Sequence, residues 1–157
     1  MNFEALLAAL KTDEGSNIVA GAHQPYRCPA GKWSVGWGHN LEAHGIPGDL
    51  VAPLLSGKGI SDEQAEQLLY ADATQAQRDA ASLLPNWLLI DSVRQNVVSN
   101  MAFNMGRSVL STFHLFLSAL DKRNYNEATF QMKDSKWYTQ TGHRSKRLAQ
   151  EMLTGAV

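Results

Sequence analysis

The chain has 157 residues, of which 44% are hydrophobic and 18% are charged, and its formal net charge is −1. A chain of this length can bury most of the apolar surface that it exposes when unfolded, so we expect one cooperative domain and a monomer. A net charge this close to zero gives no sign of a nucleic-acid-binding protein.

The chain begins with an amphipathic pattern. Apolar residues at Phe3, Leu6, Leu7 and Leu10 predict a helix from residue 2 to about residue 13, stopped by Gly15. Its apolar stretch is too short to span a membrane, and it lacks the basic start and cleavage site of a signal peptide. We therefore expect synthesis in a cytoplasm and no stable membrane association.

Residues 16–59 are rich in glycine, proline, histidine and aromatic residues. Within them Trp33, Val35 and Trp37 alternate with small or polar residues, which predicts a small sheet of two or three strands. Cys28 is the only cysteine of the chain, so an intramolecular disulfide is excluded.

A long helix is predicted from Ser61 to about Leu84. Ser61 and Gln64 have the spacing of a capping box, apolar residues follow at helical spacing, and Pro85 ends the pattern. Further helices are predicted over 91–105, where Gly106 follows, and over 112–120, 124–133 and 141–153.

These elements predict an α+β fold that is mainly helical. We expect a single domain over 1–157, with a small β lobe at about 14–60, a connecting helix at about 61–84, and a larger helical lobe. The helical lobe comprises about 85–157 and the N-terminal helix. Charge is uneven along the chain: residues 1–121 carry 7 Lys/Arg against 12 Asp/Glu, and residues 122–157 carry 7 against 3. This basic segment either attracts an anionic polymer or is a solvated helix face.

Glu14 is the first candidate for chemistry because it lies at the C-terminal end of the first predicted helix. A carboxyl group there meets the negative end of the helix dipole, and partial burial in a cleft acts in the same direction. Both effects favour the protonated form that a general acid needs. The alternative is a solvated glutamate in the last turn of the helix.

Two blocks of sequence carry a family resemblance. The first holds Asp13-Glu14-Gly15, then Tyr-Arg-Cys-Pro-Ala-Gly at 26–31 and Ser-Val-Gly-Trp-Gly-His at 34–39. The second holds Asn-Met-Ala-Phe-Asn-Met-Gly at 100–106 and Trp-Tyr-Thr-Gln-Thr at 137–141, followed by Arg144, Lys146 and Arg147. Nearly end to end, the chain resembles the phage-type lysozymes, which are the T-even phage muramidase and its endolysin relatives.

The resemblance implies hydrolysis of the β-1,4 bond between N-acetylmuramic acid and N-acetylglucosamine in bacterial peptidoglycan. It makes Glu14 the general acid, Cys28 the second group and Ser34 the hydroxyl that helps to hold the attacking water. By the same resemblance the sugar cleft is lined by Asn40, Phe103, Asn104, Phe116 and Gln131. His39 is expected to form a structural ion pair with Asp72, and Arg144 is expected near Glu14. No cofactor and no metal are expected.

Several of these positions depart from the family pattern or have a second interpretation. Cys28 stands where the family more often has Asp, so it acts as base, as nucleophile or in positioning water, or it is a structural thiol beside Pro29. Adjacent Arg27 favours partial ionisation of this thiol. Ser34 keeps the hydroxyl of the usual Thr, Phe103 is either a core residue or a sugar contact, and Arg144 is alternatively one more basic residue of the last helix.

Three rival functions remain at this stage. His39 and His44 with Glu42 raise the possibility of a zinc amidase or peptidase, but they match no specific metal spacing. A lytic transglycosylase also uses a glutamate on the same glycosidic bond. A lysozyme-like protein that binds glycan or a partner without cleavage is the third. The expected partner is peptidoglycan, reached through a holin-type membrane lesion after a period in the host cytoplasm, or from a virion tail.

Overall fold

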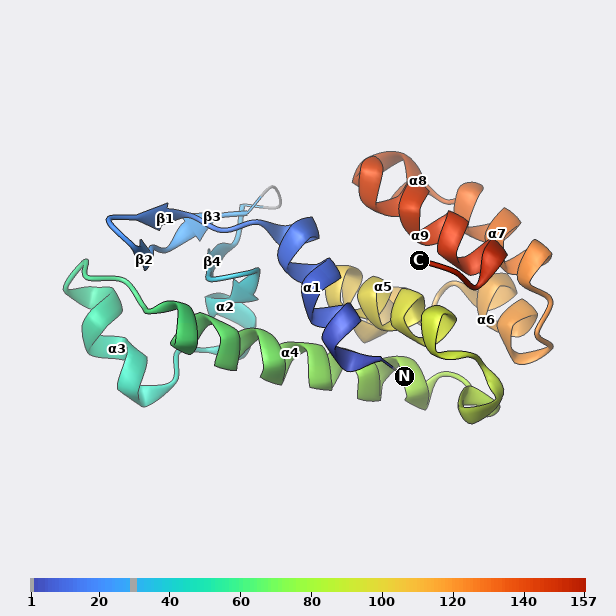
Figure 1. The fold of residues 1–157 in the computed structure, drawn as a ribbon, viewed down its shortest axis with the longest axis horizontal. Helices are drawn as coiled ribbons and strands as arrows, with labels where there is room; N and C mark the ends of the chain where they lie inside the picture. Colours follow the sequence, from blue (N-terminus) through green and yellow to red (C-terminus); the bar gives the residue numbers. More distant parts are fainter. Residues whose placement is uncertain (1, 29–30) are drawn as a thin grey trace. The chain divides into compact units, whose positions relative to one another are not determined.

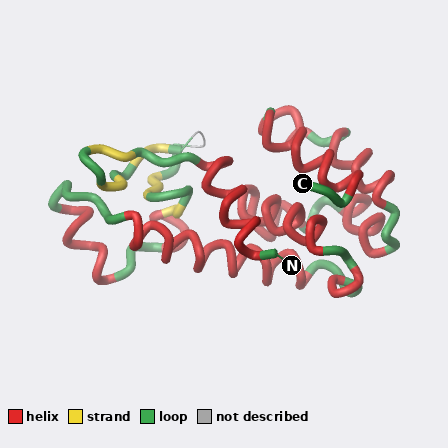
Figure 2. Tube along the Cα trace, in the orientation of Figure 1, coloured by secondary structure: helices red, strands yellow, loops and turns green. Residues whose placement is uncertain are grey.

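The computed structural model describes residues 2–28 and 31–157, so Pro29, which was considered as a neighbour of Cys28, lies outside the described residues. The chain forms two compact units. Unit 2 is Leu7–Asp72, and unit 1 is Ala73–Val157 with the start of the chain up to Leu6. Helices dominate and the strands lie in the first third of the chain (Figures 1 and 2), which confirms the predicted mainly helical α+β class.

Unit 2 contains most of α1 (Phe3–Glu14) and all of the strands that the structure describes: β1 (Ile18–Val19), β2 (Ala22–His23), β3 (Tyr26–Arg27), β4 (Trp33–Val35) and β5 (His39–Asn40). β1 and β2 pair as one antiparallel hairpin, and β3, β4 and β5 form a second antiparallel sheet with β4 in the centre. The prediction of one small sheet was therefore incomplete. The predicted strand through Trp37 was also wrong, because Gly36 and Gly38 have φ of 60° and 84° and turn the chain from β4 into β5.

Three helices complete unit 2: α2 (Leu41–His44), α3 (Gly48–Leu55) and the first half of α4 (Asp62–Ser82). The capping box that predicted α4 is present, because Gln64 N–H donates to Ser61 Oγ and Ser61 N–H donates to Gln64 Oε1. α2 and α3 were not predicted, since α2 is a single turn and α3 has Pro53 within it. The core of this unit is small and consists of Val35, Leu50, Ile60, Ala65 and Leu68.

Unit 1 holds the rest of α4, a 3-10 turn (Trp87–Leu89), α5 (Ser92–Leu110), α6 (His114–Asp121), α7 (Tyr125–Lys133), α8 (Lys136–Thr141) and α9 (His143–Thr154). The predicted break at Gly106 is real, because this residue has φ of 79° and ψ of 157°. The helix resumes directly after it, so α5 is longer than predicted. α8 was not predicted, and Gly142, with φ of 58°, separates it from α9.

The core of unit 1 is apolar and extensive. Its fully buried side chains include Met101, Phe116, Leu120, Met132 and Met152. Among the described residues, no helix combines the length and the apolar composition that crossing a membrane requires.

Asp91 and Arg94 join the start of α5 to the end of α9. Asp91 accepts hydrogen bonds from the backbone N–H and from the guanidinium of Arg94, at 3.1 and 2.5 Å. The same guanidinium donates to the carbonyl groups of Met152 and Leu153, at 2.7 and 3.0 Å. Burial opposes the charge on Asp91, but the hydrogen bonds and the charge of Arg94 outweigh it and lower the pKa of this carboxyl group.

Replacing Asp91 by Ala is expected to lower the free energy of unfolding by about 1 kcal/mol at neutral pH, the usual contribution of a helix N-cap. Because the pKa of Asp91 is lower in the folded state than in the unfolded state, its contribution is present above the ordinary pKa of 3.8. It is lost as the pH falls through the folded-state value. Urea unfolding of both proteins at pH 7 and near pH 3 measures this, and an equal difference at both pH values would contradict it.

Candidate active site

Glu14 is the last residue of α1, and its carboxyl group rests against the turn between β4 and β5. A Cβ atom added to Gly38 would lie 3.1 Å from Glu14 Oε2 and 3.2 Å from Glu14 Cδ. A residue with a Cβ at position 38 would therefore press against this carboxyl group, which would have to yield by a few tenths of an ångström. The side chain of Glu14 is half-buried, and the contact with Gly38 places its carboxyl beside the three-stranded sheet.

One face of this sheet carries the other two predicted catalytic residues. Ser34 is directly opposite Tyr26 on β3 and opposite Asn40 on β5, and directly opposed residues of antiparallel strands project from the same face. The Cys28 N–H donates to the Lys32 carbonyl at 2.9 Å, which continues the ladder by one residue. Cys28 directly follows β3, and continued alternation predicts that its side chain lies on the Tyr26 face. Ser34 is only 2% exposed, and Cys28 is half-buried.

Arg27 projects from the opposite face. Its guanidinium lies over the Trp33 ring, 4.6 Å from the ring centroid, and donates to the Gly31 carbonyl at 2.6 Å. Arg27, the last residue of β3, therefore supports the sheet from this face, whereas Cys28 directly follows β3 and is predicted to lie on the Tyr26 face.

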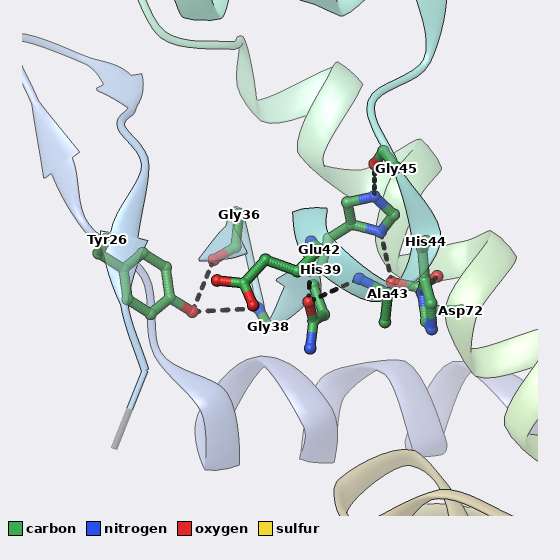
Figure 3. A network of polar contacts seen from close by, with 10 residues as sticks. Tyr26, Gly36, Gly38, His39, Glu42, Ala43, His44, Gly45 and Asp72 are labelled. Carbon is green, nitrogen blue, oxygen red and sulfur yellow. Dashed lines mark hydrogen bonds and ion pairs between the residues drawn. The ribbon is translucent and has the colours of Figure 1, made fainter. Parts of the chain in front are cut away.

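Tyr26 was quoted in the sequence motif but was not predicted to be a site residue. Its hydroxyl accepts a hydrogen bond from the Gly38 N–H at 3.2 Å and donates to the Gly36 carbonyl at 3.4 Å (Figure 3). Burial raises the pKa of Tyr26, the Gly38 hydrogen bond lowers it, and electrostatic interactions with Glu14 and Cys28 raise it further. The phenol thus keeps its proton, holds the turn on which Glu14 rests and lies within electrostatic range of both acidic groups.

His39 and Asp72 meet in unit 2. His39 Nδ1 lies 2.8 Å from Asp72 Oδ2, and His39 Nε2 donates to the Gly45 carbonyl at 3.2 Å. Burial lowers the pKa of His39, but the hydrogen bond and the charge of Asp72, together with the Gly45 carbonyl, outweigh this and leave the pKa raised. His44 Nδ1 contacts the other carboxylate oxygen of Asp72 at 3.0 Å (Figure 3).

Glu42, the third residue of the rival zinc hypothesis, is engaged elsewhere. Its carboxylate accepts from the Trp33 N–H at 3.0 Å and lies 3.2 Å from Lys32 Nζ. Asn40, a predicted sugar contact, is the N-cap of α2, and its side-chain oxygen accepts from the backbone N–H groups of Glu42 and Ala43.

His23 is a second residue that sequence reasoning missed. It is fully buried, and its ring nitrogens contact Ser16 Oγ at 2.5 Å and Asp62 Oδ1 at 2.7 Å. These contacts connect the segment that follows Glu14 to the start of α4. A histidine in a loop of this composition gave no sequence signal of burial, because its partners are 7 and 39 residues away.

The remaining predicted residues belong to unit 1. Phe103 is partly buried against the core, and Asn104 Oδ1 accepts from Trp137 Nε1 at 2.8 Å. The guanidinium of Arg144 donates to the side-chain oxygen of Asn100 at 2.8 Å. That Arg144 lies near Glu14 stays a prediction.

Phe116 and Gln131 line one pocket of about 410 Å³ in unit 1, together with Thr112, Phe113, His114, Leu115, Asp134 and Ser135. Phe116 is 1% exposed, so it serves mainly as packing beneath this pocket. Gln131 is half-buried, and its amide donates to Glu127 at 2.7 Å. That this pocket and the Glu14 region serve one saccharide stays a prediction.

Comparisons with known proteins agree on one family. Residues 18–151 match the model of the phage lysozyme family. A probable T4-type lysozyme 2 of Dictyostelium discoideum is 27% identical over 163 residues, covering 94% of this chain and 93% of that protein. The pre-baseplate central spike protein Gp5 of Enterobacteria phage T4 is 34% identical over 99 residues, which are 61% of this chain and 17% of that protein.

A third relative, the peptidoglycan hydrolase gp36 of Pseudomonas phage phiKMV, is 28% identical over 120 residues, covering 76% of this chain and 12% of that protein. The family match spans most of the chain, and it includes the sheet that carries Tyr26, Cys28, Ser34 and Gly38. The chain therefore belongs to the phage lysozyme family and is a glycoside hydrolase of the lysozyme type.

Proposed function

We propose that the chain hydrolyses the β-1,4 bond between N-acetylmuramic acid and N-acetylglucosamine in bacterial peptidoglycan, with Glu14 as the general acid. The observation that carries the proposal is the contact between the Glu14 carboxyl group and Gly38. In our proposal this contact holds the carboxyl group beside the sheet face that also bears the Cys28 thiol and the Ser34 hydroxyl. Such a set suits protonation of a leaving oxygen on one side and delivery of water on the other.

Glu14 in this proposal donates its proton to the glycosidic oxygen. A general acid must be held in place, because a shift of about 1 Å can reduce the rate by about 100-fold. Gly38 and the Tyr26 hydroxyl provide this constraint: the first leaves room for the carboxyl group, and the second fixes the turn.

Cys28 and Ser34 form the second part of the proposed machinery. Both project from the Tyr26 face of the sheet, and neither is a carboxylate, so the chain lacks the paired carboxylates of the usual glycosidase scheme. In our proposal Ser34 positions the attacking water. Cys28 acts as the base that deprotonates this water, as a nucleophile, or as a further group that positions the water.

Replacing Cys28 by Ala is expected to lower the hydrolysis rate by about 10-fold, less than the roughly 100-fold or more that a full acid–base group contributes, because Ser34 still positions the water in our proposal. Replacing Cys28 by Asp is expected to keep or raise the rate, because it supplies the second carboxylate. Release of soluble fragments from purified peptidoglycan, with circular dichroism as a check on folding, measures both variants. A folded and fully active Cys28→Ala protein would reduce Cys28 to a packing role.

Analysis of the cleavage products tests the proposed reaction. Hydrolysis leaves a free reducing end on N-acetylmuramic acid that borohydride reduces, whereas a lytic transglycosylase leaves a 1,6-anhydro end that borohydride does not alter. We expect reducible ends from purified peptidoglycan incubated with the protein. Anhydro ends would show that the reaction is lytic transglycosylation and not hydrolysis. Binding to peptidoglycan without any released fragment would support a non-catalytic lysozyme-like protein.

The proposed substrate also suggests how the protein reaches the cell wall. We propose a monomer that reaches the cell wall from the host cytoplasm through a holin-type membrane lesion. The phiKMV relative, a peptidoglycan hydrolase, supports peptidoglycan as the substrate, and the T4 relative, a pre-baseplate central spike protein, supports the alternative of a virion-associated enzyme. Turbidity of bacteria with and without permeabilised outer membranes, after external addition of the protein, tests whether access limits lysis.

A further inference from the structure

His39, His44 and Asp72 form a side-chain cluster that the proposed glycan chemistry does not use. They come from β5, from the end of α2 and from α4, and all of them belong to unit 2. His39 Nδ1 and His44 Nδ1 lie 2.8 and 3.0 Å from the two oxygens of the Asp72 carboxylate. One donor atom from each residue lies within 4.8 Å of the others. Figure 3 shows these side chains together.

The orientation of the His39 ring is fixed by its contact with Gly45. A backbone carbonyl has no proton to give, so His39 Nε2 must donate to it, at 3.2 Å. His39 Nδ1 then faces a carboxylate oxygen of Asp72 at 2.8 Å. Histidines that bind a metal through one ring nitrogen usually donate a hydrogen bond from the N–H of the other to a carbonyl or carboxylate in this way.

The cluster combines firm placement with access from solvent. The side chains of His39 and Asp72 are 7% and 12% exposed, whereas that of His44 is 49% exposed. The two buried donors are therefore held by the fold, and His44 provides an open side through which an ion and its remaining water ligands can enter. Imidazole nitrogens exclude Mg²⁺ and Ca²⁺, which prefer oxygen, and favour Zn²⁺ and its neighbours among transition metals.

We propose that His39, His44 and Asp72 bind one divalent transition-metal ion of the zinc type through two imidazole Nδ1 atoms and one carboxylate oxygen. At zinc–ligand distances of about 2.0–2.1 Å, tetrahedral ligands are about 3.3 Å apart. The N···O distances of 2.8 and 3.0 Å, which run to different oxygens of Asp72, would have to widen slightly, whereas the other donor separations, all within 4.8 Å, would have to shorten toward this value. The ion ties β5 and α2 to α4 within unit 2, so its role is structural and separate from Glu14.

The sequence offered only Glu42 as an acidic neighbour of these histidines and showed no specific metal spacing, because Asp72 is distant in the chain. Glu42 lies between them in the sequence but contacts Trp33 and Lys32. Asp72 is 28 residues beyond His44, and only the packing of α4 against α2 and β5 brings it into place.

The test uses the full-length protein, stripped of metal with a chelator and then titrated with Zn²⁺ and, separately, with Co²⁺. We expect Zn²⁺ to raise the melting temperature and Co²⁺ to give the strong visible absorption of tetrahedral coordination. His44→Gln removes one exposed ligand and leaves the cores intact, and it should weaken Zn²⁺ binding by at least about 10-fold, as loss of even an outer-shell partner does. His143→Gln, at an exposed histidine of α9, is the matched control and should bind like the parent chain.

Each other outcome overturns the proposal. If His44→Gln binds Zn²⁺ as tightly as the parent chain, the cluster is not the site. If His143→Gln loses as much affinity, binding is a property of surface histidines in general. Co²⁺ spectra that show only octahedral coordination would mean that the imidazole pair does not hold the ion.

Discussion

Replacing Glu14 by Gln is expected to lower the rate of peptidoglycan hydrolysis by at least about 100-fold, the lower bound for loss of general acid catalysis. The amide has nearly the same shape as the carboxyl group, so it fills the same space against Gly38. It cannot supply the proton to the leaving oxygen. The fold should therefore persist while catalysis fails, and thermal unfolding measured beside fragment release separates the two effects.

Glu63→Gln is the matched control for Glu14→Gln. Glu63 lies exposed in the first turn of α4, in the same unit, and its replacement removes the same charge by the same chemical change. We expect this variant to keep the parent rate. Retained hydrolysis in Glu14→Gln would remove Glu14 from the acid role, and equal loss in both variants would point to net charge as the cause.

Replacing Gly38 by Ala is expected to have the second largest effect, a fall in hydrolysis rate of up to about 100-fold through displacement of Glu14. The new Cβ would lie 3.1 Å from Glu14 Oε2 and 3.2 Å from Glu14 Cγ, so the carboxyl group has to move. Moving the end of a flexible side chain costs little free energy. The stability loss should come mainly from the positive φ of 84°, about 1–2 kcal/mol for a residue with a Cβ.

Gly21→Ala provides the control for this prediction. Gly21 has φ of 80°, nearly the same as Gly38, but a Cβ there has no atom of the described residues within 4 Å. Both variants should therefore lose similar stability, and only Gly38→Ala should lose activity. Denaturant unfolding and fragment release on all three proteins measure this, and an equal loss of activity in Gly21→Ala would contradict a specific role for the Gly38 contact.

The helix boundaries illustrate what local sequence can predict. The capping box of Ser61 and Gln64 was predicted from residues three apart, and it is present as hydrogen bonds. The helix predicted over 124–133 has Asn124 as its N-cap, where the side chain accepts from the Glu127 N–H. α3 and α8 escaped prediction because a Pro within the first and the brevity of the second conceal the helical period. Most of the strands are two residues long, too short for alternation to be detected.

The candidate site depends on contacts that no local pattern encodes. The motifs around Glu14, Cys28 and Ser34 named the residues by resemblance, but the support that Gly38 and Tyr26 give to Glu14 comes from a turn 24 residues further along the chain. The burial of His23 and the contact between His44 and Asp72 likewise depend on residues that are distant in the sequence.

The sequence by itself determined the mainly helical α+β class, the long α4 and the family, because capping, helical periodicity and motif order are local properties, and it predicted the residues for acid catalysis. Only the tertiary structure decided which partners these residues have, since it brings side chains from separate strands and helices within hydrogen-bonding distance. It made Tyr26 the support of the Glu14 turn, assigned Glu42 to the sheet and put Asp72 between two histidines.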